Sequence, residues 1–466
     1  MLSPPRSLWW ETLDEPVSPR PPLKEHLDVD VVIVGGGFTG LWTARELLER
    51  DPALRIAVVE QSVCGFGASG RNGGWASALF PVSDWTVAKR FGGDAVVPLH
   101  RVLNRAVSTL GEALAHEQID GHYRQGGTLT FARSEIQSTR LQHHVSENRD
   151  RGFGDELVWL NGDEIRDRAA LPSLFGATFA PHCARINPAR VVRGLADRLG
   201  ERGVAIYENT TVTAIEGATP TRRARIVSRG GTITANYVVR ATEAFSVDLP
   251  GLRRAVAPIY SLMIATEPLP ASFWESTGFR NYETFADDRH MIIYGQRTED
   301  NRIAFGGRGA PYHFGSSIKP KFDYDDKVFE LLEGTLRDLF PNLPGGISHR
   351  WGGPLAMPRD MMPSVNVDHA TGLASAGGYT GDGVVLAYVA GQTLADLIVQ
   401  PDSITELTSL PFVHHQSKRW PIEPARWLGI NTGLALAKRS DHVEEHQGKT
   451  SRASSLLEQL LESFPP

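Results

Sequence analysis

The chain has 466 residues, of which 41% are hydrophobic and 22% charged, and its formal net charge is −6. This composition is typical of a folded protein with two or three domain-sized units, and it lacks the basic excess that would favour nucleic acid or an anionic membrane as a partner. The two cysteines, Cys64 and Cys183, form neither a CxxC pair nor a disulfide framework, which fits a reducing cytoplasm. No cysteine or histidine spacing indicates a metal site.

Residues 1–27 are expected to form an extended arm on the surface. They contain many prolines and no apolar run that resembles a signal sequence. Nowhere does the sequence approach the ~18 uninterrupted apolar residues of a membrane span. We therefore expect a cytoplasmic protein with no membrane partner, whose arm is anchored by burial of Trp9 and Trp10.

Residues 29–60 predict a strand, a glycine turn, a helix and a second strand. The first strand, VVIV, is β-branched and apolar, as a buried parallel strand should be. It leads into GGGFTG, in which Gly35, Gly37 and Gly40 match the pattern G-x-G-x-x-G. An amphipathic helix follows, and the second strand ends in Glu60. This combination predicts a dinucleotide-binding unit.

Each part of that unit has a mechanical role. Gly35 permits the tight turn, Gly37 lets the backbone approach a pyrophosphate, and Gly40 lets helix and strand pack closely. The helix N-terminus offers free N–H groups to the phosphates, and Glu60 can accept hydrogen bonds from the adenosine ribose. The acid at position 60 disfavours NADP. The alternative is a glycine-rich turn without a ligand.

The stretch GFGASGRNGGW, residues 65–75, begins five residues after Glu60 and is too rich in glycine for a strand or a helix. It is expected to run back across the end of the sheet, where its backbone can approach a flat ligand. Ser69 and Asn72 can hydrogen-bond phosphate or ring edges, and Arg71 can neutralise pyrophosphate charge. Trp75 can pack beside a flat ring. A glycine-rich lid over NAD is the alternative.

These segments together resemble the D-amino-acid oxidase superfamily of FAD-dependent amine oxidoreductases, and within it the gamma-glutamylputrescine oxidase type. The resemblance covers roughly residues 28–400 and rests on VGGGFTG, the acid at position 60 and GASGRNGG. It implies FAD bound without a covalent link. The FAD-binding residues that we predict are Gly35, Gly37, Phe38, Thr39, Gly40, Glu60, Ala68, Ser69, Arg71, Asn72, Gly73, Gly74, Val212, Ala241, Thr242, Gly378, Thr380, Gly381, Asp382, Gly383 and Val384.

Two later parts of the chain match further motifs of the resembled family. In that family a strand at Val212 brings backbone to the adenine, and Ala241-Thr242 match the second nucleotide segment, A-T-x-A/G. Residues 373–399 are similar to the closing motif, in which a glycine turn opens a helix whose N-terminus points at the flavin. That helix dipole would stabilise the charge of the reduced flavin. Asp382 departs from the His or Asn often found there.

The fold class that follows is α/β: a Rossmann-like FAD-binding domain of the glutathione-reductase type, with an inserted antiparallel-sheet α+β substrate domain. The FAD-binding motifs are far apart in the sequence, so that domain must be discontinuous. Strands are expected at residues 256–267, 290–296 and 302–307, in the second half of the insertion, where they would form an antiparallel sheet roofing the flavin. The expected units are an arm at 1–27, an FAD-binding domain at 28–95, 180–250 and 350–405, a cap at 96–179 and 251–349, and a helical extension at 406–466.

The C-terminal extension is expected to pack on the FAD-binding domain, with a short amphipathic helix in SRASSLLEQLLESFPP. A dimer contact is the alternative, so the protein is expected to be a monomer or a homodimer.

The resemblance implies hydride transfer from an amine Cα to flavin N5, hydrolysis of the imine, and reoxidation by O2 to H2O2. Where members acting on α-amino acids place an Arg, this chain has Leu355. We therefore expect an amine with a distant anion, such as a gamma-glutamyl polyamine or an aminophosphonate. Catalytic candidates in the pocket, for each of which a packing or surface role is equally open, are Trp75, Tyr260, His290, Tyr294 and Arg308.

Two other functions remain open at this point. One is a flavin dehydrogenase that acts on an aminophosphonate or N-methyl amino acid and passes electrons to an acceptor other than oxygen. The other is a non-catalytic carrier of the same fold. The glycines of the turn, Glu60 and the closing motif argue against it, because a carrier has no reason to keep a flavin-binding site.

Overall fold

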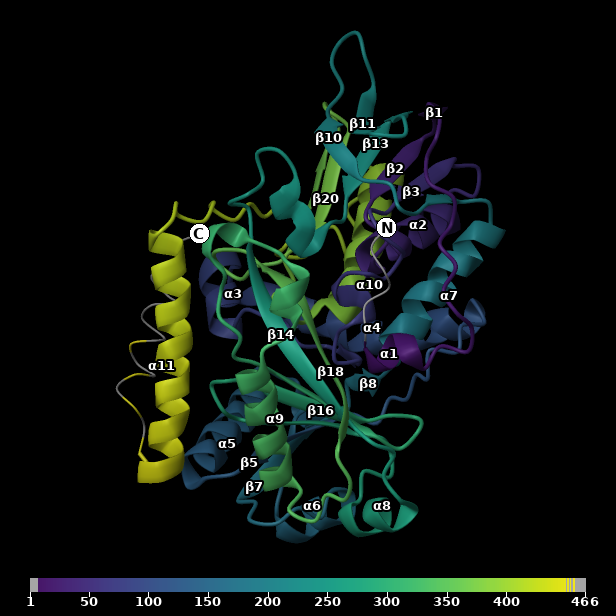
Figure 1. The fold of residues 1–466 in the computed structure, drawn as a ribbon. Coiled ribbons are helices and arrows are strands. Elements are labelled where there is room, and N and C mark those ends of the chain that lie inside the picture. The colour runs from purple at the N-terminus through teal and green to yellow at the C-terminus, as the bar shows by residue number, and fades with distance from the viewer. Residues whose placement is uncertain (1–6, 450, 452, 454–455, 457–466) are drawn as a thin grey trace.

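A computed structural model describes residues 7–449, 451, 453 and 456 of the chain. The side chain of Arg308 and most of the predicted C-terminal amphipathic helix lie outside the described residues. Two large sheets organise the fold, one in the upper and one in the lower half of Figure 1.

The first large sheet holds the nucleotide-binding motifs. Its order is β19-β20-β13-β2-β3-β9, and every pair is parallel except the antiparallel edge pair β19 and β20. All four residues of each of the two strands around the glycine turn are buried, as their β-branched sequences predict. The strands are β2 (Val31–Val34), β3 (Ile56–Val59), β9 (Ala205–Tyr207), β13 (Tyr237–Arg240), β19 (Ser364–Asp368) and β20 (Leu373–Gly377).

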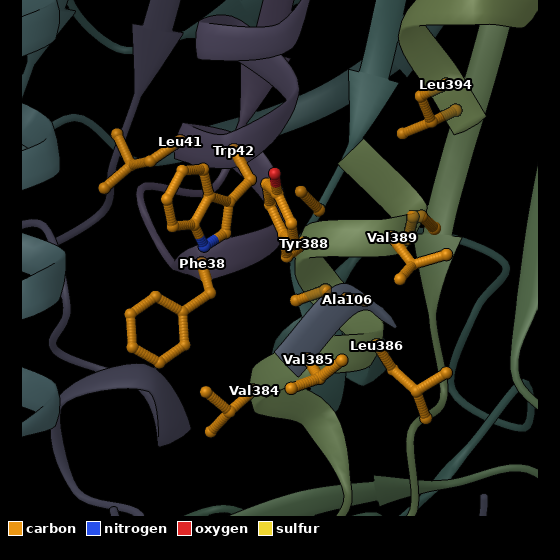
Figure 2. Close-up of a cluster of buried hydrophobic side chains, with 14 of the residues drawn as sticks. Phe38, Leu41, Trp42, Ala106, Val384, Val385, Leu386, Tyr388, Val389 and Leu394 are labelled. Carbon is orange, nitrogen blue, oxygen red and sulfur yellow. The ribbon is translucent and has the colours of Figure 1, made fainter. Parts of the chain in front are cut away.

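Three long helices cover this sheet: α2 (Phe38–Arg50), α7 (Pro188–Glu201) and α10 (Gly383–Val399). Helix α2 packs along α10, and the rings of Trp42 and Tyr388 meet edge to face with centroids 4.8 Å apart. Figure 2 shows this cluster, in which Ala106 approaches from a fourth helix, α4 (Val96–His116). The main hydrophobic core therefore includes the first turns of α2, so its packing holds the start of this helix in place beside the glycine turn.

Helix α4 lies outside the unit to which we assigned it. We expected residues 96–179 to belong to the cap, but α4 packs on α10 and shares the core of the first sheet. Its periodic apolar residues, among them Leu99, Leu103 and Leu110, are buried there. An amphipathic pattern predicts that a helix has a buried face, but does not say which partner buries it.

The second large sheet forms the cap. Its order is β18-β14-β17-β16-β15-β5-β7-β6, with antiparallel pairing except between β15 and β5. The strands are β5 (Thr128–Ala132), β6 (Val158–Leu160), β7 (Gly176–Ala180), β14 (Ala257–Thr266), β15 (Thr284–Asp287), β16 (Ile293–Arg297), β17 (Ile303–Arg308) and β18 (Ile347–Met357). Strand β18 carries residues 350–357 into this sheet, although we expected them in the FAD-binding domain.

Smaller elements complete the described chain. The helices are α1 (Leu8–Glu11), α3 (Asp84–Phe91), α5 (Glu135–Asp150), α6 (Gly162–Arg168), α8 (Ala271–Thr277), α9 (Asp326–Leu339) and α11 (Ala425–Gln447). The strands are β1 (Leu27–Asp28), β4 (Trp75–Ser77), β8 (Cys183–Arg185), β10 (Val212–Glu216), β11 (Ala224–Ser228) and β12 (Thr232–Ala235). The 3-10 turns are η1 (Ala68–Gly70), η2 (Gly93–Ala95), η3 (Gly154–Glu156), η4 (Glu243–Asp248), η5 (Phe314–Ser316) and η6 (Pro320–Asp323).

Both ends of the described chain are tied to the body. Trp9 and Trp10 of α1 are buried, and the indole N–H of Trp9 donates to the carbonyl of Asn72 at 2.8 Å. Helix α11 stands at the left edge of Figure 1 and contacts the cap rather than the FAD-binding domain, since Asp441 accepts hydrogen bonds from the backbone N–H groups of His290 and Met291. We expected the whole extension on the FAD-binding domain, and the part before α11 does lie there, where Val413 pairs with Val365 of β19 and Phe412 joins the core of the first sheet. No helix among the described residues is long and apolar enough to cross a membrane.

Candidate active site

The glycine turn between β2 and α2 leaves no room for side chains. Gly35 has a φ of +112°, and a Cβ there would lie 2.3 Å from the carbonyl oxygen of Ala241. A Cβ on Gly40 would lie 2.0 Å from the carbonyl oxygen of Gly35. The first helical N–H, that of Phe38, donates to Ser69 Oγ at 2.8 Å, which ties α2 to the glycine-rich stretch 65–75, called the flavin loop below.

Glu60 closes the other side of the turn. Its carboxylate accepts from the backbone N–H of Gly36 at 2.8 Å and of Ser62 at 2.9 Å. Burial nevertheless raises the pKa of Glu60 above its usual value. The hydroxyl oxygen of Ser62 is buried without a hydrogen-bond partner and faces the same space. A polar ligand that offers hydroxyl groups fits this corner.

A cavity of about 470 Å³, the glycine-loop cavity, opens over the turn. The predicted cofactor residues that line it are Gly35, Gly37, Phe38, Thr39, Glu60, Ala68, Ser69, Val212, Ala241 and Thr242. They come from the carboxyl ends of β2, β3 and β13, the start of β10 and the flavin loop. Ligands of open parallel sheets bind at such carboxyl ends.

Two further cavities continue the first. A narrow connecting cavity of about 60 Å³ shares Phe38, Thr39, Ala68 and Ser69 with it. The third, the roof cavity, has a volume of about 360 Å³ and lies beneath the cap sheet. It shares several walls with the connecting cavity, namely Ala68, Asn72, Leu355, Thr380, Gly381 and Val384. The three share walls in sequence and so form one path, whose lining fits an extended dinucleotide with a flat ring at the roof end.

The closing motif is at the junction of the two larger cavities. After β20 the chain turns through Gly378 and Thr380, the latter with a φ of +53°, and Asp382 is the N-cap residue of α10. Thr380, Gly381, Asp382 and Val384 line the roof cavity. The positive end of the α10 dipole therefore faces the place where a flavin ring fits, and would stabilise negative charge there.

Arg71 has a different role from the one that we expected. Its side chain is 4% exposed, and Nη1 donates to Asp323 at 2.9 Å and to the carbonyl of Gly352 at 3.1 Å. Asp323 belongs to η6 of the cap, so this pair joins the flavin loop to the cap sheet. Arg71 lines the roof cavity and not the glycine-loop cavity.

The remaining loop residues shape the backbone. The Asn72 amide donates to the carbonyls of Ala68 and Ser69 at 3.1 Å and accepts from Gly74 N–H at 2.8 Å. A Cβ on Gly73 would lie 2.4 Å from the ring of Tyr294. Gly40, Gly74 and Gly378 do not line any of the three cavities and act through close backbone contacts instead.

Two of the catalytic candidates meet in the roof cavity. Trp75 and Tyr294 both line it, with ring centroids 6.1 Å apart in an edge-to-face arrangement. The Tyr294 hydroxyl shares a hydrogen bond of 2.8 Å with Ser261 Oγ. Sequence reasoning missed Ser261, which precedes no recognisable motif.

The other candidates lie elsewhere or outside the described residues. Tyr260 is fully buried on the opposite face of β14 from Ser261, and its ring packs against those of His313 and Phe322. His290 bonds the Glu444 carboxylate of α11 at 2.9 Å and does not line the roof cavity. The backbone of Arg308 pairs with Ser261, but its side chain is outside the described residues. The structure therefore does not bring Tyr260 and His290 to the site.

Sequence reasoning also missed Glu243, which stands at the variable position of the A-T-x-A/G segment. It lines both the glycine-loop and connecting cavities, and its Oε1 accepts from Gly378 N–H at 2.8 Å and Tyr379 N–H at 3.4 Å. Burial raises the pKa of Glu243 to about 7, although those N–H groups favour the carboxylate. The acid at that position can be read in the sequence, and it could have identified Glu243 as a residue of the cofactor site.

Comparison with known proteins identifies the fold and its cofactor. The family model of DAO, described as FAD dependent oxidoreductase, matches residues 30–397. The chain belongs to this DAO family. It is 32% identical over 412 residues to the gamma-glutamylputrescine oxidoreductase of Escherichia coli (strain K12), an alignment that covers 87% of this chain and 92% of that protein. The glycine oxidase of Geobacillus kaustophilus is 24% identical over 404 residues.

The crystal structure of that glycine oxidase has the same fold. It superposes with a TM-score of 0.70 at 22% identity, covering 84% of this chain and 99% of that one. The predictions of an α/β FAD-binding fold, of an FAD-dependent oxidoreductase acting on CH–NH donors, and of FAD as cofactor are confirmed at the level of the DAO family. The cradle described above fits this cofactor, since its glycines exclude side chains from the path and Ser62 offers a free acceptor.

Proposed function

We propose that this DAO-family enzyme oxidises the primary or secondary amine of a gamma-glutamylated polyamine, with O2 as electron acceptor. The observation that carries the proposal is the lining of the roof cavity. Among the described residues of that lining, Arg71 is the single basic side chain, and its guanidinium already bonds Asp323 and two backbone carbonyls. The described part of the lining therefore offers no free cation for the α-carboxylate of a simple amino acid at the reacting end.

The aromatic walls suit an aliphatic amine. Trp75, Phe80 and Tyr294 line the cavity together with Ile292 and Ile293. Such a lining desolvates a bound ammonium group and so lowers its pKa, which favours the neutral amine that can give up hydride. The Tyr294 hydroxyl, held by Ser261, is a polar group that can orient the amine nitrogen.

The FAD supplies the hydride acceptor when it is bound, and the protein supplies position and electrostatics. The N-terminus of α10 faces the roof cavity and stabilises negative charge that gathers there. The cap strands exclude water from one side of the cavity, and Leu355 of β18 occupies a wall where an arginine would bind a carboxylate.

The Escherichia coli relative is named for gamma-glutamylputrescine, and it supports a substrate whose anionic end is far from the reacting amine. Such a molecule carries its α-amino acid group at one end and an aliphatic primary amine at the other. Both cysteines are buried free thiols, which supports a cytoplasmic location. The oligomeric state, monomer or homodimer, stays a prediction.

The test is anaerobic bleaching of the flavin spectrum of the purified holoenzyme by single amines. Gamma-glutamylputrescine should bleach it fastest, putrescine should serve as the matched amine without the glutamyl group, and glycine and sarcosine should react slowly. Admission of air should restore the spectrum with one equivalent of peroxide. Bleaching by sarcosine or 2-aminoethylphosphonate alone would replace the proposed substrate. A spectrum that returns slowly in air and quickly with a quinone would replace oxygen as the acceptor.

A further inference from the structure

The glycine-loop cavity has an unusual charge pattern for a site that receives a pyrophosphate. Three carboxyl groups line it, those of Glu60, Asp248 and Glu243, and no lysine, arginine or histidine is among the described lining residues. The cofactor of the family carries two negative charges on its pyrophosphate. Binding must therefore rely on backbone N–H groups, on the α2 dipole, and on the charge state of these acids.

The three acids are not equivalent. Glu60 is held at the ribose corner by two backbone N–H groups, where a carboxylate that accepts hydroxyl protons is the useful form. Asp248 is exposed to solvent at the rim. Glu243 alone also lines the connecting cavity, together with Phe38 and Thr39 of the first turn of α2. Helix N-termini of this kind receive the pyrophosphate, so the Glu243 carboxyl lines the part of the path where like charge is added.

The backbone at Glu243 is shaped to keep the carboxyl in this position. Its backbone φ is +42°, a value that residues other than glycine rarely adopt. Its Oε1 accepts hydrogen bonds from the backbone N–H groups of Gly378 and Tyr379. A surface acid would have no reason to hold such a conformation. The carboxyl is therefore built into the wall between the glycine turn and the closing motif.

We propose that Glu243 holds the dinucleotide as a neutral carboxylic acid, so that capture of FAD takes up one proton. A neutral carboxyl offers an O–H donor to an oxygen of the cofactor, whereas a carboxylate would repel the pyrophosphate across a cavity of low polarity. The role is one of positioning and affinity and does not depend on which amine is oxidised.

The charged and titratable groups that face Glu243 do not supply the positive charge that would neutralise its carboxylate in place of a proton. Arg240, on β13, bonds Ser246 Oγ at 2.9 Å, and burial lowers its pKa. The Tyr379 phenol bonds the Thr39 hydroxyl at 3.0 Å, and burial raises its pKa well above the usual value. Glu60 and Asp248 are the other acids on the cavity: burial raises the pKa of Glu60, and partial desolvation raises the pKa of Asp248 even though that residue is exposed at the rim. Of the three acids, Glu243 alone lines both the glycine-loop and the connecting cavity, so it is the one placed to change its charge when the pyrophosphate arrives.

The sign of the pH dependence follows from linkage. The free protein binds the proton at Glu243 with a pKa of about 7, and the pyrophosphate raises that pKa further in the complex. Affinity for FAD is therefore full below the lower pKa and falls as pH rises through it, by up to about tenfold in Kd per pH unit. The cofactor has no group of its own that changes charge near neutral pH.

The experiment is titration of the stripped protein with FAD between pH 6 and 9, following flavin fluorescence, together with calorimetry in two buffers of different ionisation enthalpy. The wild type should show a rising Kd above neutral pH and uptake of close to one proton at the alkaline end. Glu243→Gln, a permanently neutral isostere, should bind FAD with less than a twofold change over the range. Asp248→Asn, the matched amide at the rim, should keep the wild-type slope.

A wild-type Kd that does not vary with pH, with heats that do not depend on the buffer, would overturn the proposal. So would a slope that survives in Glu243→Gln, because the titrating group would then be another acid such as Glu60. If Glu243→Gln does not fold, the number of protons that the wild type takes up on binding FAD, measured by calorimetry, decides whether the proposal holds.

Discussion

The buried pair of Arg71 and Asp323 allows a sharp prediction about how the cap is joined to the flavin loop. The guanidinium is 4% exposed and the carboxylate 20% exposed, at 2.9 Å from each other. Burial raises the pKa of Asp323 and lowers that of Arg71, so for both partners desolvation outweighs their mutual attraction. A pair of this kind adds little net stability, yet removal of one partner leaves an uncompensated buried charge.

Asp323→Asn should therefore be strongly destabilising. Loss of a buried partner costs about 3–5 kcal/mol. We expect the lower end, ~3 kcal/mol, because Asp323 is partly exposed and Arg71 keeps the carbonyls of Gly67 and Gly352 as acceptors. With an unfolding entropy of ~2.1 cal/mol/K per residue, a chain of 466 residues should lose roughly 3 °C in melting temperature. The variant should also lose FAD more readily, because the loosened loop carries Ser69, which holds the start of α2.

The assay is thermal unfolding followed by tryptophan fluorescence, with and without added FAD. Asp326→Asn, an exposed acid in the first turn of α9, is the matched control and should change stability by about 0.5 kcal/mol or less. The double variant Arg71→Met with Asp323→Leu should be more stable than Asp323→Asn without cofactor. A loss below ~1 kcal/mol in Asp323→Asn, or a double variant that is less stable still, would refute the reasoning.

Three further changes test other parts of the site. Gly40→Val places carbon 2.0 Å from the carbonyl oxygen of Gly35, so the protein should purify with little flavin; a normal ratio of flavin to protein absorbance would contradict this. Tyr294→Phe removes the hydrogen bond to Ser261 and should slow anaerobic flavin reduction about tenfold, as measured by stopped flow. The flavin content should not change. An unchanged rate would show that the Tyr294 hydroxyl takes no part in the reaction. Trp9→Ala should cost about 3–5 kcal/mol in thermal unfolding because the indole is 2% exposed, and a loss under ~1 kcal/mol would show that the arm is dispensable.

The nucleotide-binding half of the fold was predictable because its determinants are local. The glycine turn, its two strands and Glu60 lie within about 30 consecutive residues, and the conformation of each is set by neighbours in sequence. The glycines at 35, 37 and 40 meet backbone or side-chain atoms at distances that no Cβ tolerates. A pattern of this kind carries its own geometry, so the parallel pairing of β2 with β3 and the cavity above the turn follow from it.

The direction of single side chains in the cap was not predictable in the same way. Strand β14 is buried at all ten positions, so its sequence has no alternation of polar and apolar residues to show which face meets the site. Tyr260 and Ser261 are adjacent and face opposite ways, and only the pairing with β17 and β18 decides that Ser261 faces the cavity. His290 was expected on a strand but precedes β16, which begins at Ile293.

Partners far apart in the sequence set the roles of charged residues. Arg71 is a reasonable ligand for a phosphate until Asp323, 252 positions later, is placed beside it. Glu444 of α11 likewise takes His290 and Arg140 as partners, whereas the C-terminal extension was expected to pack on the FAD-binding domain. Such pairings depend on how whole elements dock, and no local pattern encodes them.

This division explains why the cofactor of a DAO protein is easier to predict than its substrate. The cradle is built from contiguous motifs, and the crystal structure of a glycine oxidase shares its fold at 22% identity. The roof cavity instead draws one or two residues from each of β4, β5, β14, β15, β16 and β18, so a few substitutions on separate strands remake it while the cradle stays unchanged. Leu355 of β18 is one such position. Substrate selection in this chain therefore has to be determined by varying the cap residues one strand at a time, against an FAD site that serves as a constant reference.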